Sequence, residues 1–136
     1  AANLDFLVIA QAVVQQDLRQ TLTEISHHTR FIINADTVTI YALAGDSEQF
    51  VDYGFSIDKQ RSLQSITPPE RLLKPTSSPY RLLSLNQPPY YQIAENGICD
   101  HGLLCGGFTK AENIHAAVGI QLRASDRKMG VMYVNF

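Results

Sequence analysis

The sequence predicts one domain of the mixed α and β class (α/β, or α+β) over residues 1–136. The chain carries two amphipathic segments near its N-terminus and two pairs of β-like runs, and a long irregular segment separates these pairs. At 136 residues it has the length of one domain, and a domain of this size buries roughly two thirds of its unfolded surface. We therefore expect helices and a sheet that share one hydrophobic core.

The clearest pair of strands lies at the C-terminal end. Residues 116–122 and 129–136 are rich in β-branched, aromatic and small apolar residues, and the stretch 123–128 between them is polar. This pattern predicts a β-hairpin that is buried on both faces, so that helices can cover one face and a binding pocket the other. Strand alternation assigns Val118, Ile120 and Leu122 to one face, and Ala117, Gly119 and Gln121 to the other.

The first N-terminal segment predicts a helix from a cap at Asn3 to about Gln15. Its apolar residues occupy most of the helix circumference instead of a single stripe, so this helix needs two packing partners. One partner is the domain's own sheet. The other is either a second copy of the same helix, which gives a homodimer through Leu4 to Val14, or the C-terminal part of a longer parent protein.

A second helix is predicted from Asp17, which with Gln20 resembles a capping box, to Asn34, which supplies a C-terminal stop. His27 and His28 lie within this helix. Adjacent helical side chains diverge by about 100°, so the two imidazoles do not grip one metal ion. We expect both histidines at the surface or at its boundary.

A first hairpin and a long irregular segment occupy the middle of the chain. Residues 37–43 alternate as a strand does, 44–48 turn, and 49–55 return as a second strand. From 56 to 114 the periodicity is lost, and all six prolines lie there. Such a segment between two hairpins is a typical place for binding. It holds a helix that begins at Ser78–Pro79 and ends before Pro88–Pro89, a strand from Tyr90 to Ala94, and a helical turn capped by Thr109 and Glu112.

Charge and hydropathy argue against two classes of partner. The formal net charge of −2 gives no basic field for nucleic acid or for an anionic membrane. The most apolar run, Phe6 to Val14, is far shorter than the roughly twenty residues that span a bilayer. Two cysteines are too few for a disulfide framework, so we expect a reducing cytoplasm, although one bridge between Cys99 and Cys105 remains open.

The C-terminal residues AAVGIQLRASDRKMGVMYVNF resemble the closing hairpin of GAF domains, in which a small-residue strand precedes a charged turn and the sequence GVMYVN. The resemblance extends over nearly the whole chain, because two amphipathic segments, a first hairpin and a variable middle come before it. It implies a GAF-like, PAS-related fold: a central antiparallel sheet, N-terminal helices on one face, and an irregular lid over a pocket on the other. The C-terminal helix of the family pattern is missing, since the sequence stops at Phe136.

Five residues of metal-ligand type lie close together in the sequence of the lid. Zinc and iron sites use such residues, but a structural zinc site normally has tightly spaced ligand pairs, and this spacing is irregular. We therefore predict no metal site. The favoured interpretation is that both thiols are small buried hydrophobes and that both histidines satisfy loop carbonyls. The five residues are Cys99, Asp100, His101, Cys105 and His115.

The specialised branches of the GAF family leave one enzymatic alternative. Neither cysteine has the neighbouring histidine or aromatic residue of bilin-binding members, and the Asn-Lys and Asp-Glu pairs of cyclic-nucleotide-binding members are absent. His115 falls close to the histidine of haem-binding members without coinciding with it. We predict no cofactor. One branch reduces free methionine sulfoxide with lid cysteines, and Cys99 and Cys105 could form its nucleophile and resolving partner, although its third cysteine is missing.

A compact aromatic or heterocyclic ligand would fit a pocket walled by aromatic residues of the two hairpins and the lid, with His115 as hydrogen-bond partner. The competing interpretation is that these aromatics fill the second face of the sheet and leave no cavity. The predicted ligand-binding residues are Tyr41, Phe55, Tyr91, Cys105, Phe108 and His115.

The function expected from the resemblance is regulatory and not enzymatic. The domain would be a cytoplasmic sensory or dimerisation segment of a larger signalling protein, such as the histidine kinase of a two-component system or a cyclic-dinucleotide enzyme. Its partners would be a small molecule, a second copy of the chain, and an output domain of the same parent protein. The alternatives are a cysteine-based redox enzyme and a pure dimerisation module with a filled core.

Overall fold

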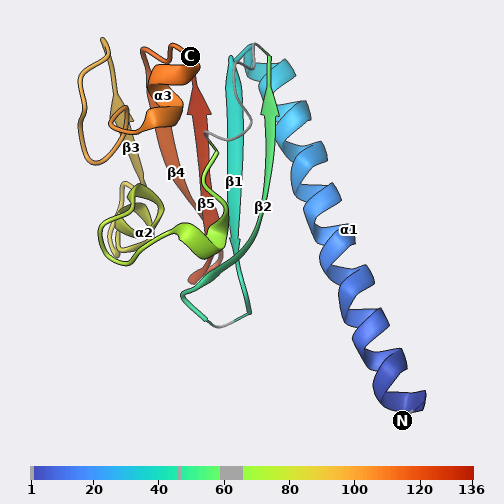
Figure 1. The fold of residues 1–136 in the computed structure, drawn as a ribbon. Helices are drawn as coiled ribbons and strands as arrows, with labels where there is room; N and C mark the ends of the chain where they lie inside the picture. The colour runs from blue at the N-terminus through green and yellow to red at the C-terminus, as the bar shows by residue number, and fades with distance from the viewer. Residues whose placement is uncertain (1, 46, 59–65) are drawn as a thin grey trace.

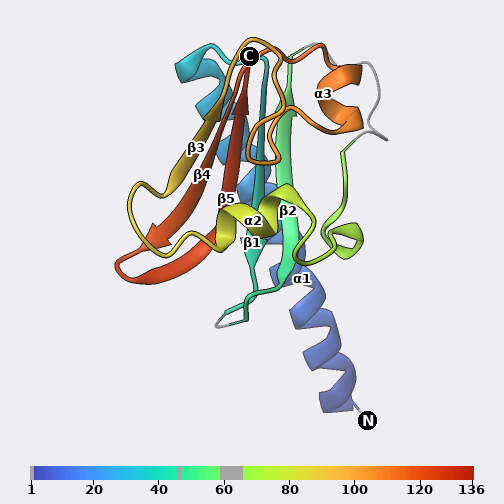
Figure 2. The same cartoon turned by 90° about the vertical axis from the view of Figure 1, so that its left-hand side faces the viewer.

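A computed structural model of the chain describes residues 2–45, 47–58 and 66–136, with side chains from residue 16 onward. Five strands form one antiparallel sheet in the order β2-β1-β5-β4-β3. Helix α1 (Ala2–Ile33) packs on one face, and residues 66–90 and 95–116 cover the other (Figures 1 and 2). The expected GAF-like fold class is confirmed. The strands are β1 (Thr37–Leu43), β2 (Phe50–Ile57), β3 (Tyr91–Ala94), β4 (Ala117–Ala124) and β5 (Arg127–Asn135).

The two predicted hairpins are β1–β2 and β4–β5, and β1 pairs with β5 to join them. Gly130 permits this pairing, because a Cβ atom there would run into the carbonyl oxygen of Tyr41. The turn of the second hairpin is shorter than predicted, since Arg123 pairs with Lys128 within the strands. Ser125 takes a φ of 57°, as a tight hairpin turn requires. The sequence predicted a turn over 123–128 because these residues are polar, and the ends of a hairpin that extend into solvent are polar as well.

The N-terminal region is a single helix, which corrects the prediction of two. Helix α1 runs without a break from Ala2 to Ile33, so Asp17 and Gln20 lie inside it and cap nothing. No Gly or Pro lies between residues 2 and 33, and Gln, Asp and Leu near the predicted break all tolerate a helix interior. Asn34 ends the helix in the left-handed region with φ 59°, as predicted. Figure 1 shows the N-terminal half of α1 extending well past the sheet.

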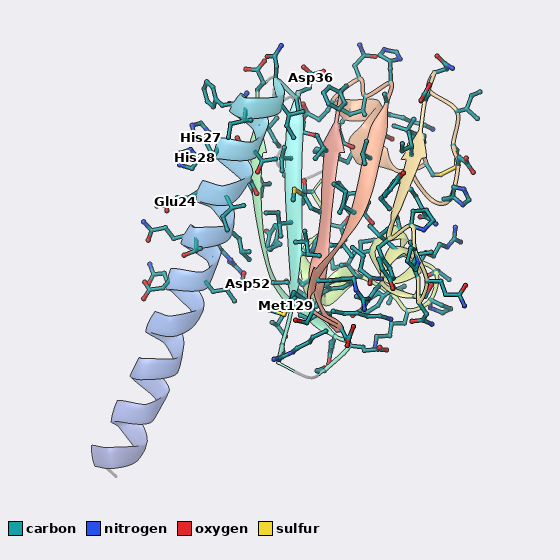
Figure 3. All side chains as sticks on the ribbon, turned by 180° about the vertical axis from the view of Figure 1, so that it is seen from behind. Glu24, His27, His28, Asp36, Asp52 and Met129 are labelled. Atoms are coloured by element: carbon teal, nitrogen blue, oxygen red, sulfur yellow. A yellow bond between two sulfur atoms is a disulfide. The ribbon has the colours of Figure 1, made fainter. Side chains whose placement is uncertain are left out.

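The C-terminal half of α1 is attached to β2 by close packing and by charged contacts. Leu22 and Ser26 are buried against the sheet, and Gly54 of β2 lies directly beneath the helix backbone. Arg19 Nε donates to Asp52 Oδ1 at 2.7 Å. Arg30 Nε donates to Ser56 Oγ at 2.8 Å. Figure 3 shows Asp52 on the sheet side of α1 and Glu24 on the side away from the sheet, and His27 Nδ1 lies 3.2 Å from Ser56 Oγ of β2. Both histidines are exposed, as predicted.

The lid is held to the sheet by a buried core and one polar anchor. Its helices are η2 (Pro69–Arg71), α2 (Ser78–Leu83) and α3 (Gly107–Ala111). Helix α2 begins at Ser78 as predicted. Helix α3 begins two residues before the predicted cap at Thr109, whose hydroxyl donates to Gly106 O. Gln121 of β4 donates from Nε2 to the carbonyls of Leu82, Leu83 and Leu85, at 2.9 to 3.1 Å. The core beneath α2 consists of Tyr41, Phe50, Tyr80, Leu82, Leu83 and Val131.

Across the described parts of the chain, none of the helices combines the length and the apolar character needed to span a membrane.

A methyl group at Gly54 is expected to loosen α1 from the sheet. A Cβ atom there would meet the backbone of Leu22 and Thr23 at 2.5 Å, and backbone cannot rotate away as a side-chain end can. Gly54→Ala should therefore lower the free energy of unfolding by about 2 kcal/mol or more, which thermal denaturation measures. Gly106→Ala is the matched control, because nothing lies within 4 Å of its Cβ position. Equal melting temperatures for the two variants would contradict this account of the interface.

Candidate ligand cavity

A cavity of about 450 Å³ lies between the sheet and the lid. The lid walls come from residues 66–79 and 102–109. Figure 2 shows α2, which begins at the end of the first of these segments, in front of the central strands. The walls are mainly apolar, with a few hydroxyl and amide groups among them. The side chains of its floor come from three neighbouring strands and are Thr39, Tyr41, Ala117, Tyr133 and Asn135.

Strand register explains why these side chains meet. Thr39 lies opposite Tyr133, and Asn135 lies opposite both Thr37 on one side and Ala117 on the other. Residues directly opposite each other in a ladder share a face, so β1, β4 and β5 present their floor residues together toward the lid. Ala117 and Gly119 share a face, as strand alternation predicted, and the structure shows that this face is the one toward the lid; Gly119 leaves room for Leu82 and Leu103 above it.

Two buried tyrosines supply neutral hydrogen-bonding groups to the cavity. Tyr41 Oη donates to Thr67 O at 2.7 Å, and Tyr133 Oη lies 2.9 Å from Ser78 Oγ. Burial raises the pKa of both phenols well above the ordinary value, because the phenolate would lose its hydration; the hydrogen bond from Ser78 offsets a part of this for Tyr133. Both residues therefore stay protonated near neutral pH. They tie the lid to the sheet without placing a negative charge in the cavity.

Two polar side chains of the lid wall have no hydrogen-bond partner among the described residues. Ser77 Oγ is buried and has no hydrogen-bond partner within the described chain. Arg71 lines the cavity from η2 and is exposed, and its guanidinium makes no ion pair or hydrogen bond with any residue in the described ranges. A buried hydroxyl without a partner costs free energy, so a bound molecule that satisfies it gains affinity.

The structure brings three of the six predicted ligand-binding residues to the cavity. Tyr41, Cys105 and Phe108 line it, whereas Phe55, Tyr91 and His115 are not among its lining residues. Tyr91 pairs with Ile120, whose side chain lies on the face opposite to Gly119 and Gln121, so Tyr91 points to the α1 side. Phe55 is at the outer strand and stacks on Tyr53 at 5.9 Å. His115 is exposed ahead of β4.

Sequence reasoning missed the polar floor at Thr39, Tyr133 and Asn135. Alternation along β5 places Tyr133 and Asn135 on one face, so a signal was present in the sequence. Which face this is depends on the pairing of β1 with β5, and these strands lie about ninety residues apart in the chain. The lid wall at 66–79 was missed because it has no periodicity to analyse.

Cys99 and Cys105 are joined by a disulfide, with their Cα atoms 5.0 Å apart. Both are exposed, so the expectation of buried thiols is wrong. His101 Nε2 lies 3.6 Å from Asp100 Oδ1, and the imidazole of neither His101 nor His115 bonds a loop carbonyl within the described ranges, although the backbone N–H of His115 donates to Phe136 O. The bridge closes a short loop whose residues 102–105 line the cavity, so it restrains one wall. Within the described residues, no group of three or more histidine, cysteine or acidic side chains is placed to hold a metal ion.

Neither a protein-family model nor a curated protein sequence matches the chain. Solved structures do match. A hypothetical protein from S. aureus aligns with a TM-score of 0.55 at 11% identity, over 88% of this chain and 91% of that one. The Staphylococcus aureus NreA protein, mutated in its nitrate binding site, aligns with a TM-score of 0.56 at 11% identity, over 91% and 86%. A phycocyanobilin-bound GAF domain from a cyanobacterial phytochrome has a TM-score of 0.46 at 16% identity, over 92% and 74%. At such identities the first two show a shared fold.

The buried tyrosines predict a loss of stability at alkaline pH. The pKa values of Tyr41 and Tyr133 are raised in the folded state, so their full contribution to stability is present below pH about 10. Above this pH the two phenols ionise in the unfolded chain while they stay protonated in the folded chain. The free energy of unfolding should then fall by up to about 1.4 kcal/mol per pH unit for each tyrosine. In Tyr133→Phe this slope should be smaller, as urea denaturation between pH 9 and 11 measures. Tyr91→Phe, at a half-exposed tyrosine, is the control. Identical slopes in all three proteins would contradict the assignment.

Proposed function

We propose that this chain is a GAF-type sensory domain that binds a small molecule between its sheet and its lid. The observation that carries the proposal is the cavity. Its volume of about 450 Å³ falls within the range of small-molecule sites. Its apolar walls and few polar groups also match such sites, in which apolar contacts give affinity and hydrogen bonds give orientation.

The shared fold of the NreA protein supports this proposal at the level of architecture. The descriptions of the NreA structures name a nitrate binding site, so a domain with this fold holds a small ligand in at least one protein. The phytochrome domain, described as bound to phycocyanobilin, is too distant to add to the argument. A reaction in this cavity is not part of the proposal.

A ligand would be read out through the sheet. It would contact Tyr41 on β1 and the lid together, and β1 is hydrogen-bonded along its length to β2. The other face of β2 carries Asp52 and Ser56, which bond Arg19 and Arg30 of α1. A shift of the lid and β1 would therefore change the contacts that hold α1, and through α1 an output domain. As a parent protein we propose a cytoplasmic signalling protein, such as a histidine kinase or a cyclic-dinucleotide enzyme.

Filling the cavity from its floor is expected to abolish binding. Ala117 is 2% exposed and lines the cavity, so the larger side chain in Ala117→Leu occupies space that the ligand needs. Native mass spectrometry of the freshly purified protein, with thermal-shift screening of nucleotides, amino acids and haem, should detect a ligand for the unsubstituted chain and none for Ala117→Leu. Ala124→Leu, at the exposed end of β4, is the control. Equal occupancy in both variants, or no ligand for the parent chain in either measurement, would contradict the proposal.

We also propose that α1 forms a homodimer with the same helix of a second copy. Leu18, Ile25 and Ile32 are exposed at 37%, 44% and 83%, and they follow one another at intervals of seven residues. This is the spacing of a coiled-coil seam. The seam lies beside the face that packs on β2, so both contacts can form at once. The earlier part of the predicted dimer contact, Leu4 to Val14, has side chains outside the described residues.

Charges in the seam should separate the dimer. In the double variant Ile25→Glu and Ile32→Glu, two like-charged pairs would have to lose water in the interface. We expect the dissociation constant, measured by sedimentation equilibrium, to rise by more than about tenfold, which corresponds to 1.4 kcal/mol. Gln20→Glu, on the exposed side of α1 away from the seam, adds a charge as a control. A parent chain that is monomeric at high micromolar concentration would refute this part of the proposal.

The disulfide supports a second candidate function, that of a cysteine-based redox enzyme that resembles free methionine sulfoxide reductases. A nucleophile and its resolving partner must come within bonding distance during turnover, and Cys99 and Cys105 do so beside the cavity. This alternative stays a prediction.

A further inference from the structure

We propose that the ligand of the cavity is a compact organic anion, with its carboxylate at Arg71 and its apolar body over the floor of the cavity. This inference rests on the proposed function and names the chemical class of the ligand. It follows from the charges, the uncommitted donors and the size of the cavity.

The charge of the cavity wall is positive. Arg71 is the one charged residue among the described residues that line the cavity. The other polar lining groups are hydroxyls, an amide and backbone, and the two tyrosines are kept neutral by burial. A cationic ligand would meet Arg71 with no carboxylate to offset it. A neutral ligand can accept only an ordinary hydrogen bond from Arg71, whereas an anion gains a stronger pair of charge-assisted hydrogen bonds.

The donors at this wall are free to bind a carboxylate. The guanidinium of Arg71 is exposed and makes no ion pair with the residues that the structure describes, so a ligand has none of those residues to displace. Ser77, six residues further along the same lid segment, contributes the buried hydroxyl without a partner. A planar guanidinium presents paired N–H groups that match the two oxygens of a carboxylate, and a hydroxyl can add a further donor.

The remaining volume requires an apolar body. A small inorganic anion would fill only a small part of about 450 Å³, and would leave much of the apolar wall facing water. Tyr41, Leu103 and Phe108 line the cavity and offer flat and branched surfaces to a ring or a short chain. An organic acid of ring size satisfies both parts of the site, since its charged end stays at the exposed Arg71 and its body is removed from water.

The test compares probes that share a shape and differ in charge. Phenylacetate, phenylacetamide and phenethylamine are titrated into the full chain, with nitrate as a fourth probe, and amide resonances of the cavity residues are followed by NMR. We expect phenylacetate to bind about tenfold or more tightly than phenylacetamide, and phenethylamine to bind most weakly. Arg71→Gln should remove the preference for the acid and change the affinity for the amide far less than the affinity for the acid. Arg81→Gln removes an exposed arginine that does not line the cavity, and should keep the preference.

The outcomes separate this inference from the proposed function. Equal binding of acid and amide, a preference that survives in Arg71→Gln, binding of nitrate alone, or no binding of any probe would each overturn the anion assignment. The proposed function would still stand if the parent chain carries a neutral molecule that Ala117→Leu excludes. If no molecule of any charge binds, both are refuted.

Discussion

The structure depends on the pairing of β1 with β5. Each of these strands belongs to a separate hairpin, and their ladder from Thr37↔Asn135 to Ala42↔Gly130 makes a single sheet of the two hairpins. The ladder requires a glycine at position 130, where a side chain would collide with the backbone of β1. The same register brings Thr39 and Tyr133 side by side beneath the lid. Without this pairing there would be no cavity floor, because Thr39 lies on β1 and Tyr133 on β5.

The two faces of the sheet are held by different forces. On the lid side, an aromatic and aliphatic core beneath α2 is combined with the anchor from Gln121, which satisfies three carbonyls at the end of α2. On the other side, α1 approaches so closely at Gly54 that little apolar side-chain volume separates helix and strand. The carboxylate of Asp52 is almost fully buried there and relies on Arg19 as its partner. A buried charge that loses its partner is costly, so this contact fixes the position of α1 along β2.

This division of forces is compatible with the sensory function proposed above. The lid is anchored at Gln121, through the hydroxyls of Tyr41 and Tyr133, and by the loop that Cys99 and Cys105 close. Between these points it contributes irregular backbone, which can adjust to a ligand at modest cost. In the proposed readout, changes in the lid would reach β1 through Tyr41. Helix α1 would respond because the hydrogen bonds between α1 and β2 are directional and would be distorted if β2 moved along the helix.

The sequence by itself determined the local elements. Periodicity and β-branched runs located all five strands, alternation separated Ala117 and Gly119 from Val118 and Ile120 on opposite faces, and Asn34 marked the end of the helix. It also placed Tyr41, Cys105 and Phe108 near the cavity. These features depend on neighbouring residues, which a linear pattern records.

The tertiary structure alone decided the features that depend on residues far apart in the chain. The register of β1 with β5 selected Thr39, Tyr133 and Asn135 for the floor, and the parity of β3 against β4 turned Tyr91 to the other face. Packing on β2 supported a helix that runs through the predicted break near Asp17. The position of Arg71 at the cavity and the bridge between the two cysteines depend on lid backbone without periodicity. Such backbone is positioned by the surface on which it packs, and that surface exists only once the sheet is assembled.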